Sequence, residues 1–185
     1  MRTGTAGLAP AMLCALIVAG CANLAPPYAA STDNVELLKS SGASAAKVGT
    51  ISVPPKLNSI QIRAVAMTSP VEGSYGAYLA DAIRQEFALA KLLDPKSSVE
   101  ISGALEQNDV DTGGLIRGSA VLVARVVVKK DGEIRFDKVK SATTEFDSNF
   151  IGAIAIPRGM QSYPVVVQEF LATLYSDAEF IAALR

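Results

Sequence analysis

The stretch Ser119–Thr143 reads SAVLVARVVVKKDGEIRFDKVKSAT. Two runs rich in β-branched and aromatic residues flank the pair Asp131-Gly132, a strong signal for a β-hairpin because both residues of such a turn take positive φ. A two-residue turn also determines how the two strands pair. The expected pairs are Lys130 with Glu133, Val128 with Arg135, Val127 with Phe136, and Arg125 with Lys138.

This register predicts one face of the hairpin that is apolar in the middle and carries basic side chains. Its members are Val121, Val123, Arg125, Val127, Lys129, Ile134, Phe136, Lys138 and Lys140. Because basic groups resist burial, we expect helices on the other face, and Glu100 or Glu106 of the preceding strand beside Arg125. An apolar surface rimmed by Arg and Lys suits a lipid or a protein partner. In the alternative, the segment Lys47–Pro55 or Phe146–Ile156 covers it.

Around the hairpin, period-2 alternation predicts further strands and spacing of three to four residues predicts helices. The expected strands span 57–68 and 99–106, the expected helices span 75–93 and 164–175, and a short last helix follows a capping box at Ser176–Glu179. Glu86 interrupts the apolar stripe of the first helix and is expected at its edge. The order predicts an α+β fold, an antiparallel sheet of about four strands with two main helices on one face (βαβββα).

The composition is typical of a globular protein and excludes several functions. Half of the 185 residues are apolar, 19% are charged, and the formal net charge is −1. Such a weak charge argues against binding of nucleic acid. The chain has no histidine, which excludes Ser-His and Cys-His nucleophile systems and removes the commonest metal ligand.

The N-terminus reads MRTGTAGLAPAMLCALIVAGC and contains the apolar run Leu8–Gly20, shorter than the roughly 20 residues that span a bilayer. Val18-Ala19-Gly20-Cys21 resembles the bacterial lipoprotein signal, in which small residues precede a cysteine. The resemblance implies cleavage before Cys21, a diacylglycerol on its sulfur and an acyl chain on its new amino group, and several chains anchor a domain stably. Ala22, where aspartate would retain the protein, implies sorting to the outer membrane. The alternative is an ordinary signal peptide or an uncleaved anchor.

These observations predict three parts of the chain. Residues 1–20 form the signal peptide, residues 21–56 the lipidated N-terminus and a tether rich in Ala, Ser, Gly and Pro, and residues 57–185 a single α+β domain. In the alternative, Lys47–Val53 forms an edge strand and packs onto the domain. Cys14 would leave with the signal and Cys21 would carry lipid, so the mature protein would have neither thiol nor disulfide.

The sequence offers weak signals for chemistry. Asp109 and Asp111 have the spacing of a calcium loop, but Ala120 stands where the bidentate glutamate is required. Neither an S-x-x-K motif nor a glycine-rich phosphate loop occurs, and no spacing selects a pair of carboxylates. We therefore predict no catalytic residue, no metal site and no cofactor, and a protein that is not an enzyme.

The order of elements, together with the anchor, resembles small outer-membrane lipoproteins such as the lipopolysaccharide-assembly lipoprotein and the auxiliary lipoproteins of lipid-transport ABC systems. The resemblance covers about residues 57–184 and implies a non-catalytic binding or assembly subunit of an envelope complex, facing the periplasm. The expected partners are the membrane, through the lipid, and an envelope protein, with a lipid ligand as a further candidate. Alternatives are a carrier of an amphiphile and a histidine-free hydrolase.

Overall fold

The computed structural model describes residues 23–185, so the predicted signal peptide and Cys21 lie outside the described residues. The strands are β1 (Asn23–Leu24), β2 (Lys47–Ser52), β3 (Ile60–Ile62), β4 (Val65–Thr68), β5 (Val99–Asp111), β6 (Arg117–Lys130) and β7 (Glu133–Asp147). The helices are α1 (Thr32–Ser40), α2 (Tyr75–Leu89), α3 (Gly152–Tyr175) and α4 (Ala178–Ala183), with a 3-10 turn, η1 (Pro55–Leu57).

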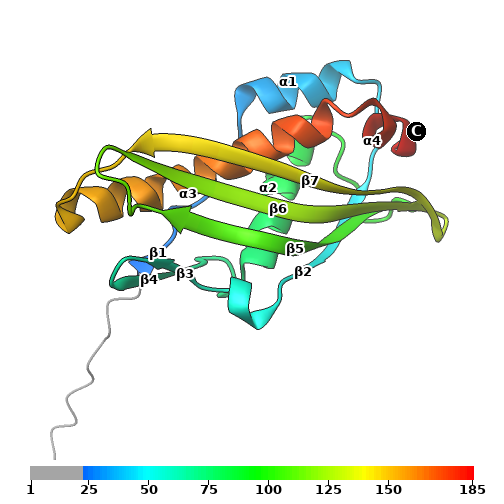
Figure 1. The fold of residues 1–185 in the computed structure, drawn as a ribbon. Helices are drawn as coiled ribbons and strands as arrows, with labels where there is room; N and C mark the ends of the chain where they lie inside the picture. The colour runs from blue at the N-terminus through cyan, green and yellow to red at the C-terminus, as the bar shows by residue number, and fades with distance from the viewer. Residues whose placement is uncertain (1–22) are drawn as a thin grey trace, which may run out of the picture.

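The main layer is a four-stranded sheet in the order β2-β5-β6-β7. Strands β5, β6 and β7 are antiparallel, whereas β2 pairs parallel with β5. Helices α2 and α3 lie against one face of this sheet, and α1 packs on the outer side of both (Figure 1). The predicted α+β class, with two main helices on one face, is therefore confirmed.

The first strand of the main sheet was wrongly predicted at 57–68. That segment contains η1 and a tight hairpin, β3-β4, which forms a separate three-stranded sheet with β1. The turn falls at Arg63, whose φ of 53° is unusual for a residue other than glycine. The alternation of apolar residues continues through the turn, so the pattern alone predicts one strand. The main sheet instead begins at β2, the edge strand that the sequence offered as the alternative.

The segment predicted as a tether is part of the folded body from Asn23 onward. β1 pairs parallel with β4, β2 pairs with β5, and α1 lies between them in the chain. Tyr28 is buried, and its ring stands edge-on to Tyr78 at 6.3 Å between centroids. The hydroxyl of Tyr78 donates a hydrogen bond of 2.8 Å to the Pro26 carbonyl. An Ala- and Pro-rich segment can thus be ordered by tertiary contacts that its composition does not reveal.

The β6-β7 hairpin turns at Asp131-Gly132 as predicted, with φ of 53° and 85°. Its register changes after the second pair, because Lys129 faces Ile134 whereas Val128 faces Phe136. Arg135 is therefore an extra residue in β7, a β-bulge. Because side chains alternate along a strand, one extra residue moves every later side chain of β7 to the opposite face.

Helix α3 is twice as long as the predicted helix over 164–175 and takes in part of the segment 146–156, since β7 extends to Asp147 and the helix begins at Gly152. Pro157 and Pro164 lie inside it, and a proline within a helix costs about 3 kcal/mol because it removes a backbone hydrogen bond. Tertiary packing offsets this cost. A Cβ at Gly159, for example, would meet the Thr112 side chain at 2.6 Å, so helix and sheet are in close contact there.

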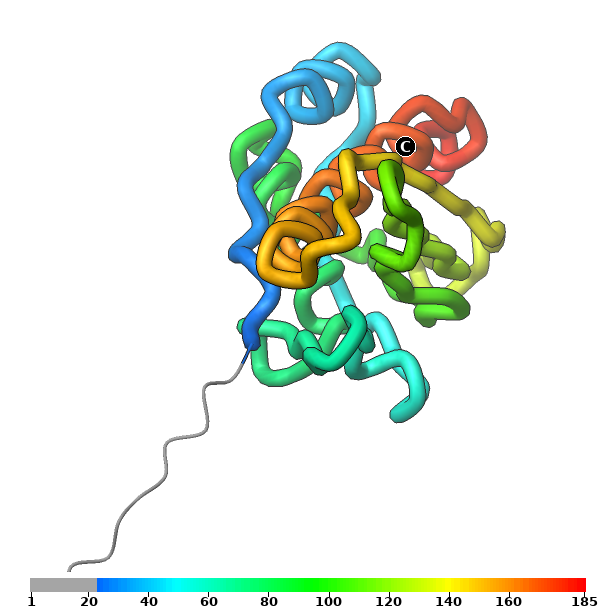
Figure 2. Tube along the Cα trace, turned by 60° about the vertical axis from the view of Figure 1, so that its left-hand side comes forward, coloured from blue at the N-terminus to red at the C-terminus, as the bar shows by residue number. Residues whose placement is uncertain are grey.

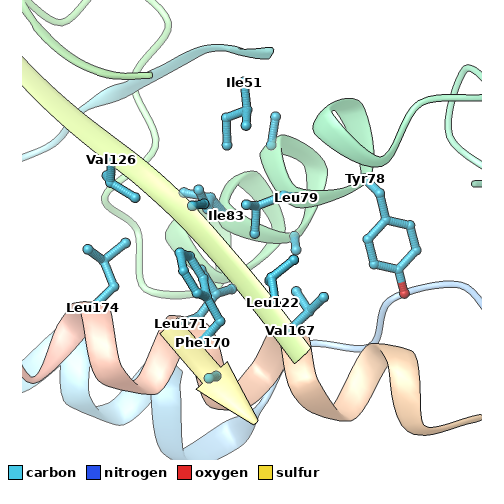
Figure 3. Packing of buried hydrophobic residues seen from close by; sticks show 14 of the residues in the cluster. Ile51, Tyr78, Leu79, Ile83, Leu122, Val126, Val167, Phe170, Leu171 and Leu174 are labelled. Carbon is cyan, nitrogen blue, oxygen red and sulfur yellow. The ribbon is translucent and has the colours of Figure 1, made fainter. Parts of the chain in front are cut away.

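The core fills the space between the main sheet and the helices. Alternate residues of β6 point to the helices and are almost fully buried (Figure 3). Leu122 and Val126 of β6 share this core with residues of both helices. These are Leu79 and Ile83 of α2, and Val167, Phe170, Leu171 and Leu174 of α3. Each buried side chain of this size contributes about 1.5–3 kcal/mol to folding.

Glu86 of α2, expected at the edge of the apolar stripe, is fully buried. Its Oε1 accepts hydrogen bonds from the Tyr28 hydroxyl at 2.5 Å, the Ser31 backbone N–H at 2.9 Å and the Asn34 amide at 3.3 Å. Burial raises the pKa of the Glu86 carboxyl, against the opposing effect of these donors. One carboxyl group thus connects the N-terminal segment to α2.

We predict that ionisation of Glu86 destabilises the fold, so that Glu86→Gln alters how stability depends on pH. Because the pKa is raised in the folded state, the contribution of Glu86 is complete below its usual value of 4.5 and is lost as the pH rises through the folded-state pKa. Urea unfolding at a series of pH values should show that the free energy of unfolding of Glu86→Gln rises relative to that of the wild type as the pH increases across this range. Glu36→Gln, on the exposed side of α1, is the control.

The two other carboxyls with a shifted pKa, Asp137 and Asp177, do not affect this comparison. Their pKa values in the folded state are lowered below 3.8, so both are largely ionised above pH 4.5, folded or unfolded. Glu86→Ala should cost about 2 kcal/mol below pH 4.5, since it leaves buried donors without an acceptor. This cost should shrink as the pH rises, because the alanine variant also lacks the titrating carboxyl. Parallel pH profiles for the wild type and Glu86→Gln would contradict the prediction.

Candidate functional site

One face of the main sheet has no helix on it, and we call it the open face. Figure 1 shows the sheet in front of α2 and α3, with this face toward the viewer. Neither predicted cover lies on it, because β2 extends the sheet at its edge and the segment after β7 leads into α3 on the opposite side. The open face is thus an exposed surface of the described domain.

Six of the nine predicted surface residues lie together on the open face. Five alternate along β6 and the sixth faces Lys129 from β7. They are Val121, Val123, Arg125, Val127, Lys129 and Ile134. The valines are half-buried by their neighbours, and Ile134 is 58% exposed. The expected facing of the side chains is therefore found along β6 and along β7 up to the bulge.

The prediction is wrong for Phe136, Lys138 and Lys140, which the bulge at Arg135 places on the helix-covered face. Phe136 is buried with its ring 5.5 Å from that of Phe180. Lys138 and Lys140 each approach the Asp177 carboxylate at 3.2 Å. Asp177 also caps α4, so these lysines hold the C-terminal helix against the sheet and do not form part of a binding surface.

The bulge also changes the partner of Arg125, which was expected to be Glu100 or Glu106. The Arg125 guanidinium makes two hydrogen bonds of 2.6 Å to Asp137, which lies diagonally across from it on β7. This bidentate pair lowers the pKa of the Asp137 carboxyl, chiefly through the hydrogen bonds from Arg125. Glu100 instead pairs with Lys47 at 3.2 Å. The centre of the open face is therefore less basic than the sequence predicted.

Two residues on this face were missed by the sequence reading, Asp137 and Val139. Val139 faces Arg125 directly and is 52% exposed. The register without a bulge assigns both residues to the covered face. Only the bulge places them on the open face, and the residue type at Arg135 does not predict a bulge. They make the face a mixture of apolar side chains around a neutralised ion pair.

A hollow of about 380 Å³ lies at the centre of the open face. Its lining comes from three neighbouring strands and from Thr50 at the edge, namely Ser102, Gly103, Ala104, Arg125, Val127, Lys129, Ile134 and Asp137. The only carboxylate in this lining is held by Arg125, so the hollow offers contact area and hydrogen bonds and has no free acid-base pair.

Asp109 and Asp111, whose spacing is that of a calcium loop, both belong to β5. Between residues 23 and 185, no group of three or more His, Cys, Asp or Glu side chains is arranged to hold a metal ion. Within the same residues, none of the helices has the length and apolar character to cross a membrane.

Comparison with known proteins supports the fold of this chain and does not extend to its function. No protein-family model matches this chain, and no curated protein matches it. The fold is similar to that of a Xanthomonas campestris protein of the DUF330 family, with 9% identity and a TM-score of 0.60 over 87% of this chain and 93% of that one. An uncharacterized protein aligns with 8% identity and a TM-score of 0.53, over 83% and 97% of the two chains. A candidate lipoprotein from Caulobacter crescentus aligns with 12% identity and a TM-score of 0.46, over 82% and 96%.

Proposed function

We propose that this chain is a lipid-anchored lipoprotein of the outer membrane, facing the periplasm, and that it binds an envelope protein through its open face as a non-catalytic assembly subunit. The anchor rests on the resemblance of Val18-Ala19-Gly20-Cys21 to the lipoprotein signal. By the resemblance in element order and anchor, we assign the complex to the handling of lipid or lipopolysaccharide.

The observation that carries the proposal is the exposed apolar surface of the open face. Val121, Val123, Val127, Ile134 and Val139 share this face of two paired strands and alternate with polar partners such as Arg125 and Asp137, and within the described residues nothing lies over them. Apolar side chains gathered on one exposed face are typical of sites of protein contact. The Arg125–Asp137 pair at its centre supplies hydrogen-bonding groups that are held in one geometry.

The interior of the domain favours this function over that of a carrier. A carrier needs an apolar cavity between the sheet and the helices. In this domain Leu79, Ile83, Leu122 and Phe170 occupy that space (Figure 3). The neutralised centre of the open face also lacks the concentrated positive charge that would bind the phosphates of lipopolysaccharide.

We predict that two lysines introduced on the open face weaken partner binding. The double variant Ile134→Lys, Val139→Lys should fold, because both side chains are more than half exposed, at 58% and 52%. Burial of two unpaired lysines in an interface should lower affinity roughly tenfold or more. The test is purification of the full lipidated chain in mild detergent, with mass spectrometry of the proteins and lipids that accompany it.

The matched control is Leu37→Lys, Leu89→Lys, which replaces two exposed leucines of α1 and α2 away from the open face. We expect a stoichiometric membrane protein with the wild type and the control, and loss of most of it with the open-face variant. A partner retained equally by both variants would refute the assigned surface. A bound lipid without any protein would favour the carrier.

We predict further that Cys21→Ala abolishes incorporation of labelled fatty acid and retention in the membrane fraction, because its sulfur and amino group would carry the acyl chains. Cys14→Ala is the control and should leave both unchanged, since Cys14 lies within the predicted signal peptide. The measurement is labelling in cells followed by fractionation and mass determination. A Cys21→Ala protein that still carries label would overturn the anchor.

A further inference from the structure

Large apolar side chains are exposed at one end of the domain, where the loop between β5 and β6 meets the loop between β7 and α3. Leu115 is 75% exposed, Ile116 74% and Phe150 72%. Ile151 and Ile154, at the start of α3, are also exposed. We call this set the apolar tip, and its members are Leu115, Ile116, Phe150, Ile151 and Ile154. Single exposed apolar residues are common, but such a group on two adjacent loops is unusual.

The apolar tip is held by hydrogen bonds between its two loops. The Ser148 backbone N–H donates to the Ile116 carbonyl at 2.7 Å. The Arg63 guanidinium, from the β3-β4 turn, donates to the carbonyls of Thr112 at 2.8 Å, Asn149 at 2.5 Å and Phe150 at 2.9 Å. Polar backbone groups are thereby bound inside, while the apolar side chains point outward.

The first residues of the folded body lie at the same end. β1 runs parallel to β4, with Asn23 opposite Met67 and Leu24 opposite Thr68, so β1 lies beside the second half of this short strand, which follows the Arg63 turn. Figures 1 and 2 show β1, the two loops and the first turn of α3 together at this end. The β6-β7 turn and α4 lie at the opposite end (Figure 1).

A lipid on Cys21 would hold this end close to the membrane. Cys21 precedes Asn23 by two residues, and two extended residues reach at most about 7 Å. Because the body begins at β1, no long tether separates the anchor from the domain. Leu24, the other residue of β1, is itself 47% exposed.

We infer that the apolar tip inserts into the lipid surface that carries the anchor, a step that rests on the proposed lipidation of Cys21. Exposed aliphatic and aromatic side chains beside an acyl anchor gain by entering the boundary between headgroups and acyl chains. The long strands run from this end to the opposite one, so insertion makes the domain stand on the membrane. The open face is then directed sideways and remains free for its partner.

Three arginines around the tip are engaged with protein atoms, which favours an apolar contact with the lipid over one through basic groups. Arg63 binds the loop carbonyls, Arg117 approaches Glu145 at 3.5 Å, and Arg158 donates to the Asp147 carbonyl at 3.3 Å. Insertion should therefore occur in zwitterionic vesicles and should persist in high salt, unlike binding through basic residues to anionic lipid.

The absence of tryptophan from the chain allows a direct test. Phe150→Trp places a single indole in the tip, and Leu115→Trp is a second reporter should the first fail to fold. Ile134→Trp, near the opposite end, is the matched control. Each lipidated full-length protein is reconstituted into phosphatidylcholine vesicles with bromine on the acyl chains, and its emission is compared with that in unbrominated vesicles.

We expect blue-shifted emission and loss of most of the fluorescence for the two tip reporters, and unchanged emission for Ile134→Trp, at low and high salt alike. Lipidated protein that floats with the vesicles but shows no quenching at the tip would overturn this inference and assign the tip to a protein contact or a second copy. Protein that lacks the acyl mass and does not float would refute the anchor itself, so the two failures are distinguishable.

Discussion

The single extra residue at Arg135 in β7 determines what each side of the main sheet can do. Before it, the strands pair as a two-residue turn requires, and after it every side chain of β7 faces the other way. Phe136 then enters the core, and the lysines that follow it bind the cap of α4. Asp137 in turn reaches Arg125 and neutralises it. One bulge thus completes the core at one end of the sheet and gives the open face its apolar, nearly neutral character.

A second constraint acts at the N-terminus, where the buried carboxyl of Glu86 collects donors from Tyr28, Ser31 and Asn34. Burial of a carboxyl group is unfavourable unless such donors are present, and the segment that supplies them is ordered as a consequence. The described residues are therefore folded from Asn23 onward, two positions after Cys21, the site of the proposed lipid. A domain without a long tether has a restricted orientation relative to the membrane. This restriction holds the apolar tip close to the lipid surface.

The two surfaces have separate roles in our proposal. The apolar tip lies at the end where the chain enters the domain, whereas the open face extends along the length of the strands (Figure 1). Contact of the tip with lipid would leave the open face accessible to a protein beside it. The domain would then present one side of its sheet at a defined height and direction, as an assembly subunit requires, with no need for a cavity or for reactive side chains.

Sequence alone determined the features that depend on neighbours in the chain: the Asp131-Gly132 turn, the start of α2 at Tyr75, the alternation of β6 and the α+β class. Those features follow from local backbone preference and from which side chains avoid water. Only the tertiary structure decided the bulge at Arg135, the burial of Glu86 and the ordering of the N-terminal segment. Each of these depends on partners far away in the chain, such as Phe180 for Phe136 and Tyr28 for Glu86. Their energies outweigh local preference, and a single sequence does not show which distant groups will meet.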